Sequence, residues 1–133
     1  MTMMPHKAGS LPLNIPESGV YLFSETENHL YVGRSKKLKQ RLREHGRGDF
    51  RKAAFAFLLA RERTELKATY QTKNSRADLM TQPKFREAFS EASKRIQLMD
   101  IRFVEETDTV RQALLEIYTA ISLNTKYNTF ETT

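Results

Sequence analysis

The sequence contains no cysteine and no tryptophan, and it has only 5 glycines and 4 prolines among 133 residues. Without cysteine the chain forms neither disulfides nor thiolate metal sites, which is compatible with a reducing compartment. No stretch of the sequence approaches the roughly 20 apolar residues of a membrane span. No apolar run of signal-peptide length follows the N-terminus. We therefore expect a cytoplasmic protein, intracellular and not secreted, that does not act at a membrane.

Length and composition are those of one globular domain, since 39% of the residues are hydrophobic and 133 residues bury a single core. Residues 1–18 hold three of the four prolines and show little hydrophobic periodicity. We expect residues 1–14 to be a flexible N-terminal tail and residues 15–133 to form the domain. The sequence has no recognisable helix-turn-helix, zinc finger or second domain.

Positive charge is concentrated in one segment. Residues 34–63 carry 11 Lys and Arg against 3 Asp and Glu, whereas the whole chain has a net charge of +6. A concentrated basic stretch is typical of proteins that bind the phosphate backbone of nucleic acids, although it also occurs as a solvated helix face in ordinary basic proteins. If the segment binds nucleic acid, its exposed contact residues are expected to be Arg34, Lys36, Lys37, Lys39, Arg43, Arg47, Arg51 and Lys52.

Hydrophobic periodicity predicts three strands. Residues 19–24 and 30–35 are rich in β-branched and aromatic side chains and flank a polar stretch, which predicts a β-hairpin with a five-residue loop. Residues 96–105 alternate well enough for a third strand. The sequence therefore predicts an α+β fold with a three-stranded, mostly antiparallel sheet flanked by helices.

Helices are predicted between and after these strands, in the order β-β-α-α-α-β-α. Ser35 is a candidate cap for a helix over about 36–45, and helical spacing continues over about 49–63 and again from about residue 83. The last helix begins after Thr107 or Asp108 and runs to about residue 123. We interpret the helical region of about residues 46–95 as an insertion between the hairpin and the third strand.

Two residues of the first helix are candidates for phosphate chemistry. Arg41 and His45 are four positions apart, so they project from the same face of the helix one turn apart. Arg41 is three residues from Leu38, which places the pair beside the apolar stripe of that helix. A guanidinium grips a phosphate in bidentate fashion, which a lysine does not reproduce. Taken singly, each side chain is equally typical of a protein surface.

Glu116 is a candidate metal ligand on the last helix. It lies on the flank of an apolar stripe, where a carboxylate reaches a cleft without being fully buried; the stripe consists of Val110, Leu114, Ile117 and Ile121. Hard divalent cations such as Mg²⁺ bind through one or two carboxylates, completed by water and substrate phosphate. One glutamate is thus chemically sufficient, although glutamates on helix flanks are usually only solvated. Asn128 follows this helix, where asparagine is also an ordinary turn residue.

In order and spacing, these elements resemble the GIY-YIG endonuclease domain. Gly19-Val20-Tyr21 and Tyr31-Val32-Gly33 stand for its two short motifs, with valine replacing isoleucine in both, and the two tyrosines are ten positions apart. Arg41 follows eight residues after the second glycine, His45 lies one turn on, and Glu116 precedes Asn128 by twelve residues. The resemblance covers about residues 15–46 and 100–130. In isolation, each tripeptide is also typical of ordinary hairpin packing.

The resemblance implies a catalytic set of six residues. In such a site Glu116 holds one Mg²⁺ or Mn²⁺, Arg41 stabilises charge on the phosphoryl oxygens, and Tyr21 is the candidate general base. The remaining members are expected to orient water or phosphate, to assist proton transfer and to brace the site; they are Tyr31, His45 and Asn128. A phenol has a pKa near 10, so Tyr21 needs neighbouring positive charge, from Arg41 and the metal, to act at neutral pH.

The expected function is that of a divalent-metal-dependent endonuclease acting on DNA, in repair or restriction, with RNA as a possible substrate. The alternative is a nucleic-acid-binding module that has the fold but does not cut, and a third reading is a basic protein that binds a protein partner. The absence of an appended recognition module predicts weak sequence preference, structure-selective cutting, or a protein partner for substrate targeting. The oligomeric state does not follow from the sequence.

Overall fold

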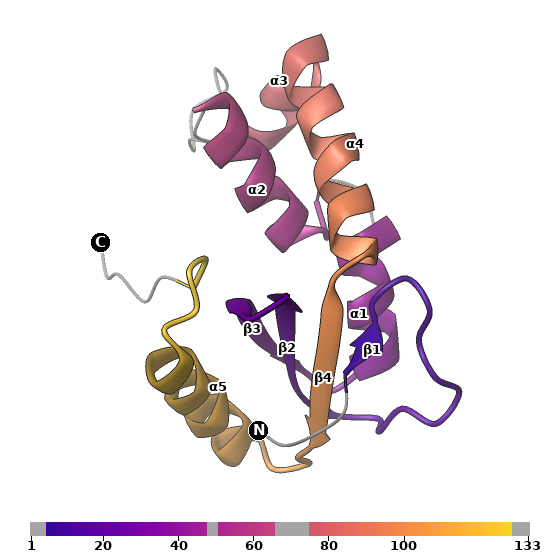
Figure 1. Ribbon diagram of the computed structural model, residues 1–133, viewed down its shortest axis with the longest axis vertical. Helices are drawn as coiled ribbons and strands as arrows, with labels where there is room; N and C mark the ends of the chain where they lie inside the picture. The colour runs from indigo at the N-terminus through magenta and orange to yellow at the C-terminus, as the bar shows by residue number, and fades with distance from the viewer. Residues whose placement is uncertain (1–4, 48–50, 66–74, 129–133) are drawn as a thin grey trace.

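The computed structural model describes residues 5–47, 51–65 and 75–128. Its centre is a four-stranded antiparallel sheet of order β1-β4-β2-β3, made of β1 His6–Lys7, β2 Gly19–Glu25, β3 Asn28–Ser35 and β4 Asp100–Glu105 (Figure 1). The helices are α1 Leu38–Arg47, α2 Ala54–Thr64, α3 Arg76–Met80, α4 Pro83–Gln97 and α5 Thr109–Leu123. The α+β class and the order of the long elements are confirmed. The expectation of three strands is wrong by one, because β1 adds a fourth.

The additional strand β1 lies within residues 1–14, for which the sequence predicts a flexible tail. His6 pairs with Ile101 of β4 and Lys7 with Asp100, and the Lys7 ammonium lies 2.8 Å from the Asp100 carboxylate. The pairing continues past the strand, where the Ala8 amide donates to the Met99 carbonyl. A two-residue strand is too short to produce a hydrophobic period, so sequence patterning does not reveal it.

The hairpin turn is tighter than the predicted five-residue loop. Glu25 pairs with Asn28, which leaves Thr26 and Glu27 as the turn, and Thr26 has a positive φ of 56°. The other three residues expected in the loop, Glu25, Asn28 and His29, instead extend the two strands. The register also shifts between Phe23 and Ser24, so the distal end of the hairpin carries an irregularity.

The two faces of the sheet are covered differently (Figure 1). One face carries Tyr21 and Phe23, which belong to the main core together with buried residues of α1, α2 and α4. The opposite face carries Val20, Leu22 and Val32, which pack against the inner side of α5. This alternation follows from the two-residue period of a strand, and it makes β2 a central strand buried on both faces.

The helices α2 and α4 extend the main core beyond the end of the sheet, where they pack against each other (Figure 1). Phe57 of α2 and Phe85 of α4 meet there with ring centroids 5.0 Å apart. The polar stretch 64–82 contains the short helix α3, and residues 66–74 of it lie outside the described residues. Pro83 begins α4, as the sequence predicts.

The orientation of α5 differs from the expected one. Asp108 caps it, since its carboxylate accepts a hydrogen bond from the Arg111 amide, and this confirms the predicted start. The apolar stripe of the helix, however, points away from the sheet, with all four of its side chains exposed: Val110, Leu114, Ile117 and Ile121. The buried positions are Gln112, Thr119 and Ala120. None of the helices in residues 5–47, 51–65 and 75–128 is long and apolar enough to cross a membrane.

Candidate active site

Tyr21 and His45 form the buried centre of the site. Tyr21 comes from the middle of β2 and His45 from the last turn of α1, and the phenol oxygen lies 2.7 Å from Nε2 of the imidazole. Both side chains are fully buried on the face of the sheet that α1, α2 and α4 cover. Phe23 packs edge-on against both rings and holds them in place. The hydrogen bond is therefore shielded from bulk water.

Burial keeps both members of this pair neutral. It lowers the pKa of His45 to about 3, mainly because an imidazolium is poorly solvated there, and the Arg41 charge lowers this pKa further. Burial raises the pKa of Tyr21 far above its ordinary value, and Tyr31 adds to this effect, whereas the charge and hydrogen bond of Arg41 lower it. In the protein alone desolvation outweighs Arg41, and the expected lowering of the Tyr21 pKa by Arg41 and a metal together stays a prediction.

Tyr31 lies beside this pair on the edge strand β3. Its ring stacks on Phe55 of α2 at 4.7 Å between centroids and meets His45 edge-on at 5.6 Å. Burial raises the pKa of Tyr31, while the Arg41 charge lowers it. The packing fixes the direction of the phenol and brings both tyrosines under the influence of one guanidinium.

Arg41 is held at the mouth of the site by the segment that follows α1. Its guanidinium donates a 2.6 Å hydrogen bond to the Lys52 carbonyl, and it lies 3.9 Å from the Glu44 carboxylate one turn along the same helix. The side chain is 27% exposed, so it is fixed from behind yet open to solvent. The same guanidinium also forms a hydrogen bond with the Tyr21 phenol, so it joins that phenol to the open mouth of the site.

Gly33 and Gly19 are required because atoms of neighbouring strands approach them too closely to leave room for a Cβ. Gly33 pairs with Tyr21 across the hairpin, and a Cβ at Gly33 would lie 2.3 Å from the Tyr21 phenol oxygen. A Cβ at Gly19 would lie 2.1 Å from the Val104 carbonyl of β4. The two glycines of the tripeptide motifs therefore allow the Tyr21 ring to cross β3 and allow β4 to pair closely with β2.

Glu116 approaches the site from the other face of the sheet. It projects from α5 toward β3, with a carboxylate oxygen 3.7 Å from Nε of Arg34. Burial raises its pKa, while Arg34 lowers it, and the negative charge of Glu116 raises the pKa of both Tyr21 and Tyr31. Glu116 is thus within electrostatic range of both phenols, and it lies on the inner side of α5, not on the flank of the apolar stripe as expected.

Asn128 fastens the edge strand between the two site residues Tyr31 and Gly33. Its Oδ1 accepts a 2.8 Å hydrogen bond from the Val32 amide, and its Nδ2 donates a 2.9 Å hydrogen bond to the Val32 carbonyl. Thr125 donates a further hydrogen bond to Oδ1 at 2.8 Å. The side-chain amide imitates a neighbouring strand and occupies both backbone polar groups of one residue, Val32, on the open edge of the sheet.

A comparison with protein-family models matches residues 17–128 to the GIY-YIG catalytic domain. The match spans both tripeptides and ends at Asn128, so it contains every element of the site. The chain belongs to the GIY-YIG family. No curated protein and no solved structure matches it. The GIY-YIG catalytic domain is a nuclease domain that acts on DNA and generally depends on a divalent metal, and the family is one of endonucleases.

Within this GIY-YIG domain, the eight basic residues expected to bind nucleic acid are all on the surface or at its margin. One row on α1 is formed by Lys39, Arg43 and Arg47, which are four residues apart and exposed. At 100° per residue this row faces away from Arg41, and it lines a cavity of about 240 Å³ beside residues 8–13. The other five surround the ends of the helix and the following segment: Arg34, Lys36, Lys37, Arg51 and Lys52.

Three supporting residues are found only in the structure. Glu44 lies between Arg41 and Lys52, at 3.9 and 3.8 Å respectively, and Phe55 supplies the surface on which Tyr31 stacks. Thr125 holds Asn128. The position of Glu44, three residues after Arg41, is a usable sequence signal for a helical ion pair. The other two act across long sequence separations or outside helices, where spacing carries no such signal.

Proposed function

We propose that this chain is a divalent-metal-dependent endonuclease that hydrolyses phosphodiester bonds in DNA, with Tyr21 as general base. The observation that supports this most directly is the 2.7 Å hydrogen bond between the Tyr21 phenol and His45, with Arg41 acting on the same phenol oxygen. A buried phenol bonded to a neutral imidazole has a route for its own proton.

The proton route follows from this pair. A water molecule attacks the phosphorus atom, Tyr21 takes the proton of that water, and the phenolic proton passes to Nε2 of His45. The new bond joins water oxygen to phosphorus, and the bond to the leaving alkoxide breaks. His45 becomes an imidazolium, a form that the anionic phosphate stabilises when it lies beside Arg41. The Nδ1 atom of His45 has no hydrogen-bond partner among the described residues, so no protein carboxylate there fixes the imidazolium.

Arg41 is the group that receives the phosphate. Its guanidinium is open to solvent on one side and anchored by the Lys52 carbonyl on the other, which fixes it before substrate arrives. Charge that builds up on the nonbridging oxygens in the transition state is stabilised by such a pre-positioned donor. Tyr31, stacked on Phe55, orients the attacking water or the phosphate from the adjacent strand.

Glu116 has the properties of a ligand for one hard divalent cation. It is a half-buried carboxylate whose pKa is raised by burial, and Arg34 lies 3.7 Å away as an ion-pair neighbour. No group of three or more His, Asp or Glu side chains able to hold a metal occurs in the described part of the chain. Mg²⁺ or Mn²⁺ would have Glu116 as its protein ligand, with water and phosphate oxygens completing the shell. Bound there, the cation supplies positive charge that stabilises the leaving oxygen.

The substrate class is tested with a panel of nucleic acids. Linear, branched, flapped and single-stranded DNA, with RNA of the same sequences, is incubated with Mg²⁺ or Mn²⁺, and the products are resolved by size. We expect metal-dependent cleavage of DNA by wild type, loss of cleavage in Arg41→Ala, and retained cleavage in Arg86→Ala, an exposed arginine on α4. Salt-sensitive DNA binding without any cleavage would instead identify a binding module.

A further inference from the structure

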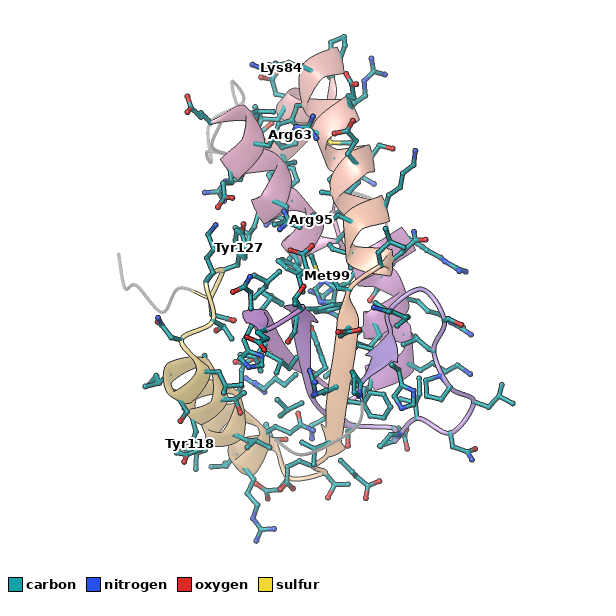
Figure 2. All side chains as sticks on the ribbon, viewed as in Figure 1. Arg63, Lys84, Arg95, Met99, Tyr118 and Tyr127 are labelled. Atoms are coloured by element: carbon teal, nitrogen blue, oxygen red, sulfur yellow. The ribbon has the colours of Figure 1, made fainter. Side chains whose placement is uncertain are left out.

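The most unusual surface of the molecule is the outer side of α5. Among the described residues, seven large hydrophobic side chains are exposed, and five of them form one patch on this helix, with exposed fractions of 41–70%. We call these five the outer stripe of α5: Val110, Leu114, Ile117, Tyr118 and Ile121. Tyr118 projects from the side of the helix that faces away from the sheet (Figure 2). A contiguous apolar patch of this kind is typical of an interaction site.

The large apolar side chains of α5 are exposed even though the helix has enough of them to pack against the sheet. The helix places Gln112, Thr119 and Ala120 against the sheet and presents its large side chains to solvent. If α5 were rotated by half a turn about its own axis, its large apolar side chains would pack against the sheet. The helix already contacts β2 and β3 on its inner side, so the outer stripe is left for a second surface.

The spacing of the outer stripe suits a second helix of the same kind. Positions 110, 114, 117 and 121 follow steps of four, three and four residues, which is the seam of a helix pair. Over 15 residues α5 is about 22 Å long. In an antiparallel pair related by a twofold axis, Val110 would lie against Ile121 of the second copy and Leu114 against Ile117 of the second copy. The same patch then serves both partners, as an isologous interface requires.

Charge at the two ends of α5 selects the antiparallel direction. Three acids, Glu105, Glu106 and Asp108, precede the helix, against one base, Arg111, in its first turn. Beyond the other end stands Lys126, which lies 3.6 Å from the Glu62 carboxylate of α2 and is still 62% exposed. An antiparallel pair brings the acidic end of one copy to the lysine end of the other, whereas a parallel pair brings like ends together. The helix dipoles favour the same arrangement.

We propose that the outer stripe of α5 is a self-association surface, on which a second copy of this chain docks with its own α5 antiparallel. Glu116 projects from the other side of the helix, so the dimer leaves the candidate active site open. The proposal does not depend on the catalytic assignment. The area is small compared with the roughly 800 Å² per partner of a standard interface, so association is expected to depend on concentration.

Sedimentation velocity of the full chain over about 1–300 µM tests the association. Wild type is expected to pass from monomer to dimer in this range. Leu114→Glu places an unpaired charge in the seam and is expected to weaken the dimer more than about 100-fold. The matched control is Leu98→Glu, an exposed leucine at the end of α4, which is expected to dimerise like wild type. Thermal unfolding of all three proteins verifies that each is folded.

Cysteine cross-linking tests the relative direction of the two α5 helices. Because the chain contains no cysteine, only the introduced residues can form a disulfide. The double variant Val110→Cys/Ile121→Cys is expected to form a covalent dimer on mild oxidation, because the two positions meet across an antiparallel pair. Eleven residues of helix keep them about 16 Å apart within one chain, too far for an internal disulfide. Each single variant is expected to stay monomeric under denaturing conditions. Cross-linking by Val110→Cys alone would overturn the antiparallel arrangement.

Two results would overturn the association itself. One is a wild-type protein that stays monomeric at every concentration, which would leave the stripe to a different partner or to another part of the chain. The other is a dimer that Leu114→Glu does not weaken, which would place the contact elsewhere. DNA cleavage is not a readout in either case, so failure of this proposal and failure of the nuclease assignment are separate results.

Discussion

The phenol oxygen of Tyr21 lies 2.7 Å from Nε2 of His45, and both side chains are excluded from solvent. One residue comes from the central strand of the sheet and the other from the helix that follows the hairpin, so the contact links the first tripeptide motif to α1. The pair connects a candidate base to a proton acceptor that is neutral at physiological pH. The first two predictions follow from this contact.

Tyr21→Phe is expected to reduce DNA cleavage by about 100-fold or more, since removal of a general base costs 10²–10⁴-fold. The ring and its packing against Phe23 remain, so the fold is expected to persist. Cleavage rates under single-turnover conditions, with circular dichroism as the folding check, provide the measurement. Cleavage at the wild-type rate by Tyr21→Phe would exclude this phenol as the base.

The stability of the protein is expected to fall as the pH drops below about 6.5, because of His45. The pKa of His45 is about 3 in the folded protein and near its ordinary value when unfolded, so the unfolded state binds the proton first. Between pH 6.5 and 5.5 this costs about 1 kcal/mol, and the loss continues downward toward pH 3. Stability from this residue is fully present above pH 6.5.

Urea unfolding at pH 7.5, 6.5 and 5.5 measures this dependence. The matched variant is His45→Gln, whose amide can keep a hydrogen bond to Tyr21 but does not titrate. Its midpoint is expected to vary less with pH than that of wild type, whatever its absolute stability. Equal slopes in the two proteins would show that His45 is not the titrating group.

Gly33→Ala is expected to destabilise the domain by about 3 kcal/mol and to lower its melting temperature by roughly 10 °C. The new Cβ would lie 2.3 Å from the Tyr21 phenol oxygen, and the Tyr21 ring is too tightly buried to move aside. Gly46→Ala is the control, since its Cβ would meet only the flexible Gln97 side chain at 3.1 Å. The control is expected to stay within about 1 kcal/mol of wild type, because alanine favours the helix. Thermal unfolding compares the two, and equal melting temperatures would contradict the close-approach argument.

Asn128→Ala is expected to loosen the edge strand at the site. It removes two hydrogen bonds to the backbone N–H and C=O of Val32 and so costs about 1–3 kcal/mol. Faster exchange of the Val32 amide, measured by NMR, is the specific readout, with a reduced cleavage rate as its consequence. Asn128→Asp keeps the acceptor for the Val32 amide and is expected to lie between alanine and wild type. Unchanged exchange in the alanine variant would show that the amide does not brace the strand.

Spacing alone predicts which of these residues share a face, because helices and strands have fixed periods, whereas their assignment to a site comes from the resemblance to the family. Arg41 and His45 are one turn apart on α1, and the strand period places Tyr21 and Tyr31 on the same face of the hairpin. Asn128 forms hydrogen bonds with β3, which agrees with the expected bracing role. Its contribution to catalysis stays a proposal.

The orientation of α5 could not be anticipated, because the hydrophobic period identifies an apolar face without saying what covers it. The outer stripe of α5 is apolar yet exposed, and Gln112 is buried instead. The dominance of desolvation over Arg41 at Tyr21 also depends on burial by Phe23, His45 and the helices, which sequence spacing does not report. The strand β1 contains only two residues, too few to give a hydrophobic period that would predict it.

Strand scission of a supercoiled plasmid by wild type and by Glu116→Gln, with Mg²⁺ and with a chelator, tests the central claim most directly. The glutamine has the shape of the glutamate but not the charge that binds a divalent cation. We predict nicking by wild type with Mg²⁺, none with the chelator, and a loss of at least about 100-fold in the variant at unchanged stability. Nicking that survives the chelator, or a variant that cuts like wild type, would contradict the assignment of this chain as a metal-dependent nuclease acting through Glu116.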